Sequence, residues 1–417
     1  MNEFNYRDGQ LYAEDCKVSD IVAEVGTPVY IYSQKTLERH FNVFDEAMGG
    51  LDHLICFSVK SNSNLAVLRL FANLGGGADI VSGGELFRCL KAGMEPNRVV
   101  FSGVGKTREE IRYALESGIM MFNVESEMEL EEIQRVASEM GKIAPISFRV
   151  NPDIDPKTHP YISTGLKKNK FGVEVKQAVE LYRKAAGMDA IEILGIDCHI
   201  GSQLTTLSPF EETVLKLREI VEDLEREGIQ IRWIDLGGGL GITYNDETPP
   251  SPEAYAKTVR KAAEGMSQGF IFEPGRVMAG NAGILVTRVL YVKQGPVKTF
   301  IVVDAGMNDM VRPSLYGAYQ EIQPVVASDA KIVADVVGPI CESGDFLAKE
   351  REVPNAKPGE LLSVMSAGAY GFTMASNYNS RPRPAEVMVN GEDYFVIRRR
   401  ETYEDLVRGE QIPPWLS

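Results

Sequence analysis

A lysine ends one of the most apolar runs in the chain. Residues 55–60 read ICFSVK, and the polar residues SNSN follow directly. Lysine is seldom fully buried without a partner, because its ammonium loses its hydration there or its pKa falls. An uncharged amine is a nucleophile toward carbonyl groups. Lys60 is therefore a candidate for covalent chemistry.

Two glycine-rich turns are candidates for binding an anion. Residues 235–241 read DLGGGLG, and three successive glycines leave backbone N–H groups unshielded, which can hold a phosphate without a lysine. Residues 272–276 read FEPGR, where Pro274 and Gly275 turn the chain and expose the amides of Gly275 and Arg276. A lysine facing two phosphate-binding turns is what a Schiff base with pyridoxal phosphate requires. Glu273 then suits the pyridine nitrogen, which a carboxylate keeps protonated.

Two glycine-rich stretches resemble nucleotide-binding motifs, but each lacks a glycine that the motif requires. In FSGVGKTREE (residues 101–110) the position where a Walker A loop needs its first glycine is Val100, inside a predicted strand. The stretch DLGGGLGITY lacks the third glycine of a dinucleotide fingerprint. We therefore expect Gly105 and Lys106 to form a strand-to-helix turn, and we expect no Rossmann site.

A bound metal is not expected either. The chain has four histidines, no HExxH motif and no cysteine partners at metal spacing. His199 nevertheless stands in CHIGSQ, between an apolar run and a bare turn, so we predict a functional role for it.

Composition restricts the partners and the compartment. The net charge of -15 opposes binding to nucleic acid or to anionic lipid. Five scattered cysteines without a CxxC pair are typical of a reducing compartment. The first residues lack the features of a signal peptide, and no window approaches 18 uninterrupted apolar residues. We expect a cytoplasmic protein outside the membrane.

Eight apolar runs alternate with longer amphipathic segments and predict a (β/α)8 barrel, whose active site lies at the C-terminal ends of its strands. The runs are residues 53–60, 76–82, 98–103, 120–126, 145–152, 193–202, 231–239 and 269–276. Chemically capable residues end nearly every run: Lys60, Asp79, Ser82, Ser102, Asn123, Glu125, Arg149, Asn151, His199, Ser202, residues 237–239, Glu273 and Arg276. The two glycine turns follow the last two runs, where such barrels often bind phosphate.

The rest of the chain predicts a second, mainly antiparallel β domain. Strand-like runs without long helices occupy residues 283–295, 298–306, 331–339, 360–370 and 385–399. Near the N-terminus, Asp8 and Gly9 form a dipeptide that favours a tight hairpin turn. We expect this hairpin region to join the second domain, which would make that domain discontinuous.

Seven motifs in order resemble the diaminopimelate decarboxylase family, which has the alanine racemase-like fold of pyridoxal phosphate enzymes. They are FSVKSN, CHIGSQ, DLGGGLG, EPGR, VDAGMND, CESGD and SAGAYGF, and they span nearly the whole chain. The resemblance implies a barrel of residues 34–277 that binds pyridoxal phosphate, a β domain of residues 1–33 and 278–417, and a homodimer with shared active sites. It also implies a carboxy-lyase that converts meso-2,6-diaminopimelate, at its D-centre, to L-lysine and carbon dioxide, the last step of lysine biosynthesis.

The resemblance also assigns roles to single residues. For the cofactor it implies the covalent lysine Lys60, the neighbouring acid Asp79, the ring-stacking His199, the pyridine partner Glu273, the phosphate contacts Ser202, Gly239, Gly275 and Arg276, and the nearby Tyr370. For the substrate it implies Arg276, Arg312 and Tyr316 at the distal carboxylate, Glu342 at the distal amine, Tyr370 close by, and the proton donor Cys341 from across the dimer interface.

One departure from the family pattern surrounds the lysine. Phe57 and Ser58 replace the usual Tyr-Ala, and Ser61 replaces an alanine. Other activities on the same fold remain open: decarboxylation of ornithine, arginine or carboxynorspermidine, racemisation, or binding of pyridoxal phosphate without turnover. A plain distal ammonium calls for an acid, whereas Arg276 and Arg312 suit a carboxylate, so the arginines favour diaminopimelate.

Overall fold

The computed structural model describes residues 2–152, 154 and 170–416. The chain divides into two compact units, which we call the barrel unit (residues 38–278) and the β unit (residues 1–37 and 279–417). Helices α2 (Gln34–Ala47) and α10 (Arg276–Ala279) contain the two limits between the units. No helix in the described part of the chain is long and apolar enough to cross a membrane.

The barrel unit is a closed ring of eight parallel strands, as predicted from the eight apolar runs. The strands are β5 (His53–Ser58), β6 (Gly77–Ile80), β7 (Val99–Phe101), β8 (Met121–Val124), β9 (Ala144–Asn151), β11 (Ile191–Asp197), β12 (Trp233–Asp235) and β13 (Gly269–Phe272). Each strand pairs in parallel with the next, and β13 pairs with β5 to close the ring. A short strand, β10 (Val173–Glu174), extends the edge of β9.

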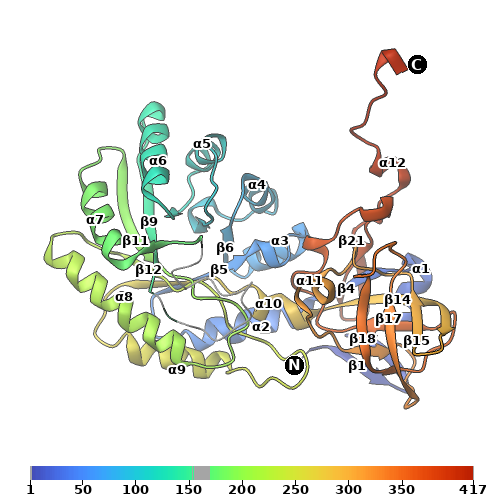
Figure 1. Cartoon of the computed structure of the whole chain (residues 1–417). Coiled ribbons are helices and arrows are strands. Elements are labelled where there is room, and N and C mark those ends of the chain that lie inside the picture. The colour runs from blue at the N-terminus through green and yellow to red at the C-terminus, as the bar shows by residue number, and fades with distance from the viewer. Residues whose placement is uncertain (1, 153, 155–169, 417) are drawn as a thin grey trace. The chain divides into compact units, whose positions relative to one another are not determined.

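Helices surround this ring (Figure 1). They are α3 (Leu65–Asn73), α4 (Gly83–Lys91), α5 (Arg108–Ser117), α6 (Glu127–Met140), α7 (Val175–Ala186), α8 (Ser208–Arg226) and α9 (Pro252–Ala262). Capping residues fix where several of them begin. Ser82 and Ser126 accept hydrogen bonds from the first turns of α4 and α6, and Thr107 forms a full capping box with Glu110. These caps place the strand ends at one rim of the barrel.

The Gly-Lys-Thr sequence is the strand-to-helix turn that we expected. Thr107 caps α5, and Lys106 is buried with its Nζ 2.7 Å from Glu129 Oε1. The same Nζ donates to the backbone oxygens of Gly103 and Asn123, both at 2.8 Å. With all its donors used inside the protein, this lysine is structural rather than a phosphate ligand.

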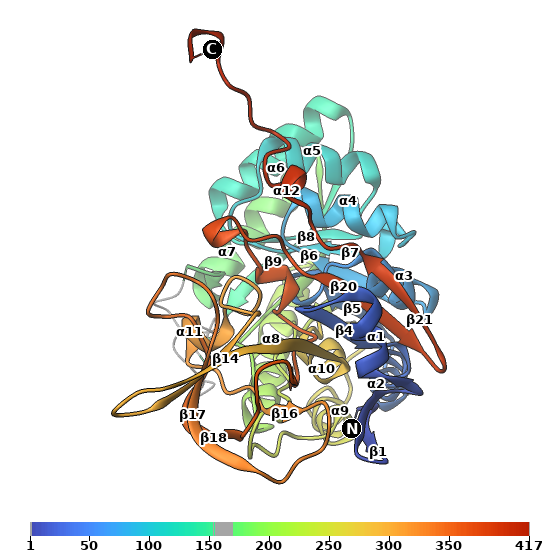
Figure 2. The same ribbon diagram turned by 90° about the vertical axis from the view of Figure 1, so that its right-hand side faces the viewer.

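The β unit is mainly antiparallel, as predicted. Its large sheet contains β18 (Phe346–Pro354), β17 (Lys331–Val337), β15 (Thr299–Val303), β14 (Gly283–Gln294), β4 (Val29–Ser33), β20 (Ala385–Asn390) and β21 (Asp393–Arg398). Strand β19 (Leu361–Val364) also pairs with β14, and β16 (Ile322–Pro324) pairs with β19. Figure 2 shows β4, β20 and β21 side by side. Two pairs, β15 with β17 and β4 with β20, are parallel, and each has the long connection that a parallel pair needs.

The predicted N-terminal hairpin is present. Strands β1 (Phe4–Arg7), β2 (Gln10–Ala13) and β3 (Cys16–Lys17) form a small sheet followed by α1 (Val18–Val25). The turn residues Asp8 and Gly9 both have positive φ, 48° and 72°, as a type I′ turn requires. Short helices α11 (Arg312–Tyr316) and α12 (Tyr403–Leu406) complete the unit.

Three strands of the large sheet of the β unit were not predicted. β18 carries an exposed charged centre, Lys349 and Glu350, so its sequence lacks an uninterrupted apolar run. β16 has only three residues, and β4 lies between two helices in the sequence, although all five of its residues are buried. Strands of these kinds depend on their neighbours in the sheet more than on local pattern.

Candidate active site

Lys60 lies at the rim of the barrel beside an acidic partner. It belongs to a single 3-10 turn, Val59–Ser61, directly after β5. Its Nζ donates to Asp79 Oδ2 at 2.7 Å, and Asp79 comes from the neighbouring strand β6. The Asp79 side chain is fully buried, whereas the Lys60 side chain is 37% exposed. The amine is therefore paired with a buried carboxylate, while part of the lysine side chain is exposed.

The Ser58 hydroxyl contacts the acidic member of this pair. Its Oγ lies 2.8 Å from Asp79 Oδ2 and 2.9 Å from the backbone oxygen of Glu273, so its hydroxyl can donate to either. The departure from the family pattern before the lysine thus adds a hydroxyl to the Asp79 environment.

Glu273 follows β13 and is buried among other carboxyl groups. The carboxyl oxygens of Asp197, Asp235 and Glu273 lie within 4.8 Å of one another. Burial, followed by repulsion from Asp235, Asp79 and Asp197, raises the pKa of Glu273 well above its usual value. Burial likewise raises the pKa of Asp235 to about 6, although hydrogen bonds from Gly237 and other neighbours oppose the rise.

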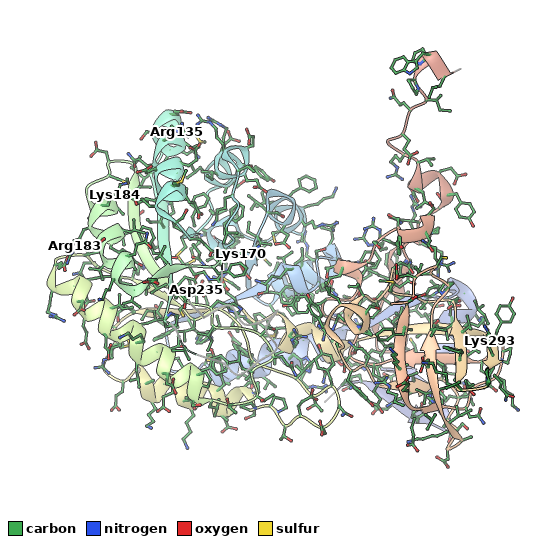
Figure 3. The ribbon with its side chains drawn as sticks, in the orientation of Figure 1. Arg135, Lys170, Arg183, Lys184, Asp235 and Lys293 are labelled. Atoms are coloured by element: carbon green, nitrogen blue, oxygen red, sulfur yellow. The ribbon has the colours of Figure 1, made fainter. Side chains whose placement is uncertain are left out.

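Hydrogen-bond donors already occupy this carboxyl cluster. Asn123 Nδ2 donates to Asp235 Oδ2 at 3.1 Å, and Arg149 Nε lies 4.0 Å from Asp197 Oδ2. A metal ion at these oxygens would lie close to both nitrogen donors and be repelled by them. The chemistry of the donor set therefore favours a hydrogen-bonded acid cluster. Asp235, labelled in Figure 3, lies within the barrel unit, whereas Arg183 and Lys184 of α7 lie on its outside.

His199 presents a neutral imidazole at the same rim. Removal of water lowers its pKa well below the usual value, and the charges of Arg149 and Lys60 lower it further. Nδ1 accepts a hydrogen bond from the amide of Gly238 at 3.1 Å. The proton of the neutral ring therefore resides on Nε2.

The two glycine turns form a backbone surface at which other atoms approach closely. Gly239 has φ +114°, and a side chain there would come within 2.6 Å of the backbone oxygen of Gly201. A side chain at Gly275 would come within 3.0 Å of Ser58 Cβ. Within the described residues, the amide N–H groups of Gly239 and Gly275 donate to no protein acceptor. They are therefore available to an anion.

Arg276 and Ser202 complete this donor set. The Arg276 guanidinium is buried and donates to Ser202 Oγ at 3.0 Å and to Tyr244 Oη at 2.7 Å. Two bare amides, a hydroxyl and a guanidinium match the acceptors of a phosphate group. The residues present thus fit the phosphate of pyridoxal phosphate, with an amine at Lys60 and an acid at Glu273 in the same barrel.

The other five predicted residues belong to the β unit. Cys341 is exposed, and its amide donates to Asn379 Oδ1 at 2.7 Å, while Tyr378 Oη donates to Glu342 Oε2 at 3.4 Å. Arg312 and Tyr316 are the first and last residues of α11. This helix contacts the loop that carries Cys341 and Glu342 through a hydrogen bond from Ser314 Oγ to the backbone oxygen of Gly344. Tyr370 lies after β19 with a positive φ of 57°. The printed contacts thus place Cys341, Glu342 and helix α11 at one loop of the β unit.

Four polar residues of the barrel site were not singled out from the sequence: Ser147, Asp197, Asp235 and Tyr244. Asp197 and Asp235 each end a strand, which is the signal that identified the others. Ser147 lies inside β9, and Tyr244 lies beyond the glycine turn, so neither had a local signal.

Comparison with known proteins agrees with this geometry. Residues 34–280 match the family model for the pyridoxal-binding domain of pyridoxal-dependent decarboxylases. The chain is 53% identical over 415 residues to a diaminopimelate decarboxylase of Pseudomonas aeruginosa, covering 99% of this chain and 100% of that protein. The chain belongs to the diaminopimelate decarboxylase family. The resemblance inferred from the seven motifs is confirmed, and pyridoxal phosphate is the cofactor of this family.

Solved structures of the family have the same fold. A diaminopimelate decarboxylase of Helicobacter pylori complexed with L-lysine has a TM-score of 0.91 at 45% identity, covering 94% of this chain and 98% of that chain. One from M. jannaschii in complex with L-lysine has a TM-score of 0.95 at 39% identity, covering 100% of both chains. The predicted barrel with a second, mainly antiparallel β domain is therefore confirmed.

Proposed function

We propose that this chain is a carboxy-lyase that removes the carboxylate at the D-centre of meso-2,6-diaminopimelate, giving L-lysine and carbon dioxide, the last step of lysine biosynthesis. One observation carries the proposal: the barrel rim combines an amine, a buried pyridine partner and a phosphate-binding backbone in a chain aligned over 99% of its length with a diaminopimelate decarboxylase.

Bound pyridoxal phosphate supplies an electron sink for the C–C bond that breaks. In the barrel unit, Lys60 supplies the amine that holds the cofactor covalently, with Asp79 as its acid partner. With the cofactor bound, the neutral ring of His199 would pack against it, and Glu273 would pair with the pyridine nitrogen. Ser202, Gly239, Gly275 and Arg276 would hold its phosphate, and Tyr370 is assigned to the cofactor by the family resemblance. In this assignment residues 34–277 are the cofactor-binding barrel.

Substrate recognition falls largely to the β unit, residues 1–33 and 278–417 in this assignment. Arg312 and Tyr316, with Arg276 of the barrel, bind the distal carboxylate. Glu342 binds the distal amine, and Tyr370 contributes to the same pocket. Cys341 donates the proton that replaces carbon dioxide, and its exposed thiol suits a group that acts on a bound molecule.

We assign Cys341 and Glu342 to the active site of a second copy, so that the enzyme is a cytoplasmic homodimer with shared sites. The resemblance to the family supports the shared sites of a homodimer. The cysteines support the cytoplasm, because their number is odd, four of them are buried and none is paired.

Related substrates provide the decisive comparison. Ornithine and arginine lack a distal carboxylate, and a buried arginine such as Arg312 would then face no anion, which is unfavourable. Purified protein loaded with pyridoxal phosphate should release carbon dioxide from meso-diaminopimelate, with lysine as the product, and not from L-ornithine, L-arginine or carboxynorspermidine. Release from one of those three alone would overturn the substrate assignment. Cofactor binding without release from any substrate would indicate a homologue that binds without turnover.

A further inference from the structure

Asn123 is held in one orientation at the centre of the barrel. It belongs to β8 and is completely buried. Its Oδ1 accepts a 2.6 Å hydrogen bond from Ser147 Oγ of β9. Its Nδ2 faces two carboxyl groups, which when ionised can only accept hydrogen bonds. Both ends of the amide thus require the same orientation.

This amide contacts the carboxyl group that is assigned to the pyridine nitrogen. Asn123 Nδ2 lies 3.5 Å from Glu273 Oε1, and Ser102 Oγ lies 3.4 Å from the same oxygen. Asn123 Nδ2 also lies 3.1 Å from Ser102 Oγ and 3.1 Å from Asp235 Oδ2. In the described part of the chain, both of these side-chain donors approach Glu273 at Oε1 rather than at Oε2.

We infer that Asn123, oriented by Ser147, is a positioning residue that holds Glu273 through Oε1 and keeps its second carboxyl oxygen available for the ring nitrogen of the cofactor. This inference rests on the proposed function, because it assumes that Glu273 meets that nitrogen. It adds two residues, Asn123 and Ser147, which do not touch the cofactor in this role and act through Glu273.

The charges around Glu273 explain why an amide suits this position. Asp235, Asp197 and Asp79 surround Glu273, while Lys60 lies at the rim and Arg149 pairs with Glu125 at 3.1 Å. The neighbouring His199 is neutral. A neutral donor in contact with both Asp235 and Glu273 offers a hydrogen bond to the two carboxyl groups without adding a charge. An aspartate at position 123 would instead add another buried carboxyl group.

The test measures cofactor binding and needs no turnover. Dissociation constants are measured by equilibrium dialysis for pyridoxal phosphate and for 1-deaza-pyridoxal phosphate, in which a CH group replaces the ring nitrogen. The ratio of the two constants reports how well Glu273 engages that nitrogen. We expect Asn123→Ala to reduce the preference for pyridoxal phosphate by up to roughly tenfold, the effect of losing one hydrogen bond. Ser147→Ala, which leaves Asn123 free to rotate, should reduce it less.

Thr213→Val is the matched control, because it removes another buried hydroxyl of the barrel unit, which donates to Pro209 O at 2.7 Å. It should leave the ratio at the wild-type value. The inference is overturned if Asn123→Ala and Ser147→Ala both keep the wild-type ratio of the two dissociation constants. It is also overturned if Asn123→Ala and Thr213→Val reduce that ratio equally. A wild-type protein that binds neither ligand would overturn the proposed function and the inference together, whereas an unchanged ratio overturns the inference alone.

Discussion

Lys60 and Asp79 form an ion pair of 2.7 Å across two neighbouring barrel strands, with Ser58 opposite Asp79 in the strand register. If this amine is the covalent attachment point, Lys60→Ala should abolish the absorbance of protein-bound cofactor and the release of carbon dioxide. Lys91→Ala, at an exposed position of α4, should leave both unchanged. Turnover by Lys60→Ala at the wild-type rate would show that another group holds the cofactor.

Ser58 should contribute to stability more than to catalysis. Its hydroxyl donates within the Asp79 environment, and losing one buried hydrogen bond typically costs about 1 kcal/mol. We expect Ser58→Ala to lower the free energy of unfolding in urea by about that amount. Carbon dioxide release should stay near the wild-type rate, because Ser58 contacts Asp79 and a backbone oxygen and is not assigned to the cofactor or the substrate. Ser138→Ala, exposed on α6, should change the free energy of unfolding little. A large loss of activity in Ser58→Ala would instead assign the hydroxyl a role in the reaction.

His199 should make the cofactor-free protein less stable in mild acid. Its pKa is lowered in the folded state, so below the unfolded pKa of about 6.5 the unfolded chain binds a proton that the folded chain does not. The free energy of unfolding should therefore fall as the pH decreases from 6.5 to 5.5, by about 1 kcal/mol from this group.

His199→Gln should remove this part of the pH dependence while retaining an acceptor for the Gly238 amide. The raised pKa values of Asp235 and Glu273 act in the opposite direction, because they make the free energy of unfolding fall as the pH rises. They are present in both proteins, so the difference between the two urea-unfolding profiles isolates the imidazole. Parallel profiles from pH 7 to 5.5 would contradict a neutral His199.

Cys341 should act in proton transfer rather than in binding. Its replacement by alanine should lower kcat by roughly 10²- to 10⁴-fold, the usual contribution of a positioned acid, and leave KM within a few-fold. Because the other four cysteines are buried, mild alkylation with iodoacetamide should inactivate the wild-type protein through Cys341. Cys89→Ala serves as the control, since Cys89 is buried in α4. An unchanged kcat in Cys341→Ala would assign the proton to another donor.

Local patterns in the sequence were sufficient for the architecture and for many of the candidate residues. The eight apolar runs became the eight barrel strands, because a strand buried on both faces needs consecutive apolar residues. Lys60, His199 and Glu273 follow such runs directly, and the start of a loop after a barrel strand marks the rim. The glycine turns were recognised because backbone that must approach other atoms closely tolerates only glycine.

By itself, then, the sequence determined the family, the barrel, the cofactor and the candidate residues of the rim. The tertiary structure alone decided which of these residues touch. It placed Asp79 against Lys60, brought Asp197 and Asp235 close to Glu273, and oriented Asn123 through Ser147 of the next strand. Such contacts join residues far apart in the sequence, 215 positions in the case of Ser58 and Glu273. Their geometry and pKa values arise from burial and strand register, which no local pattern records.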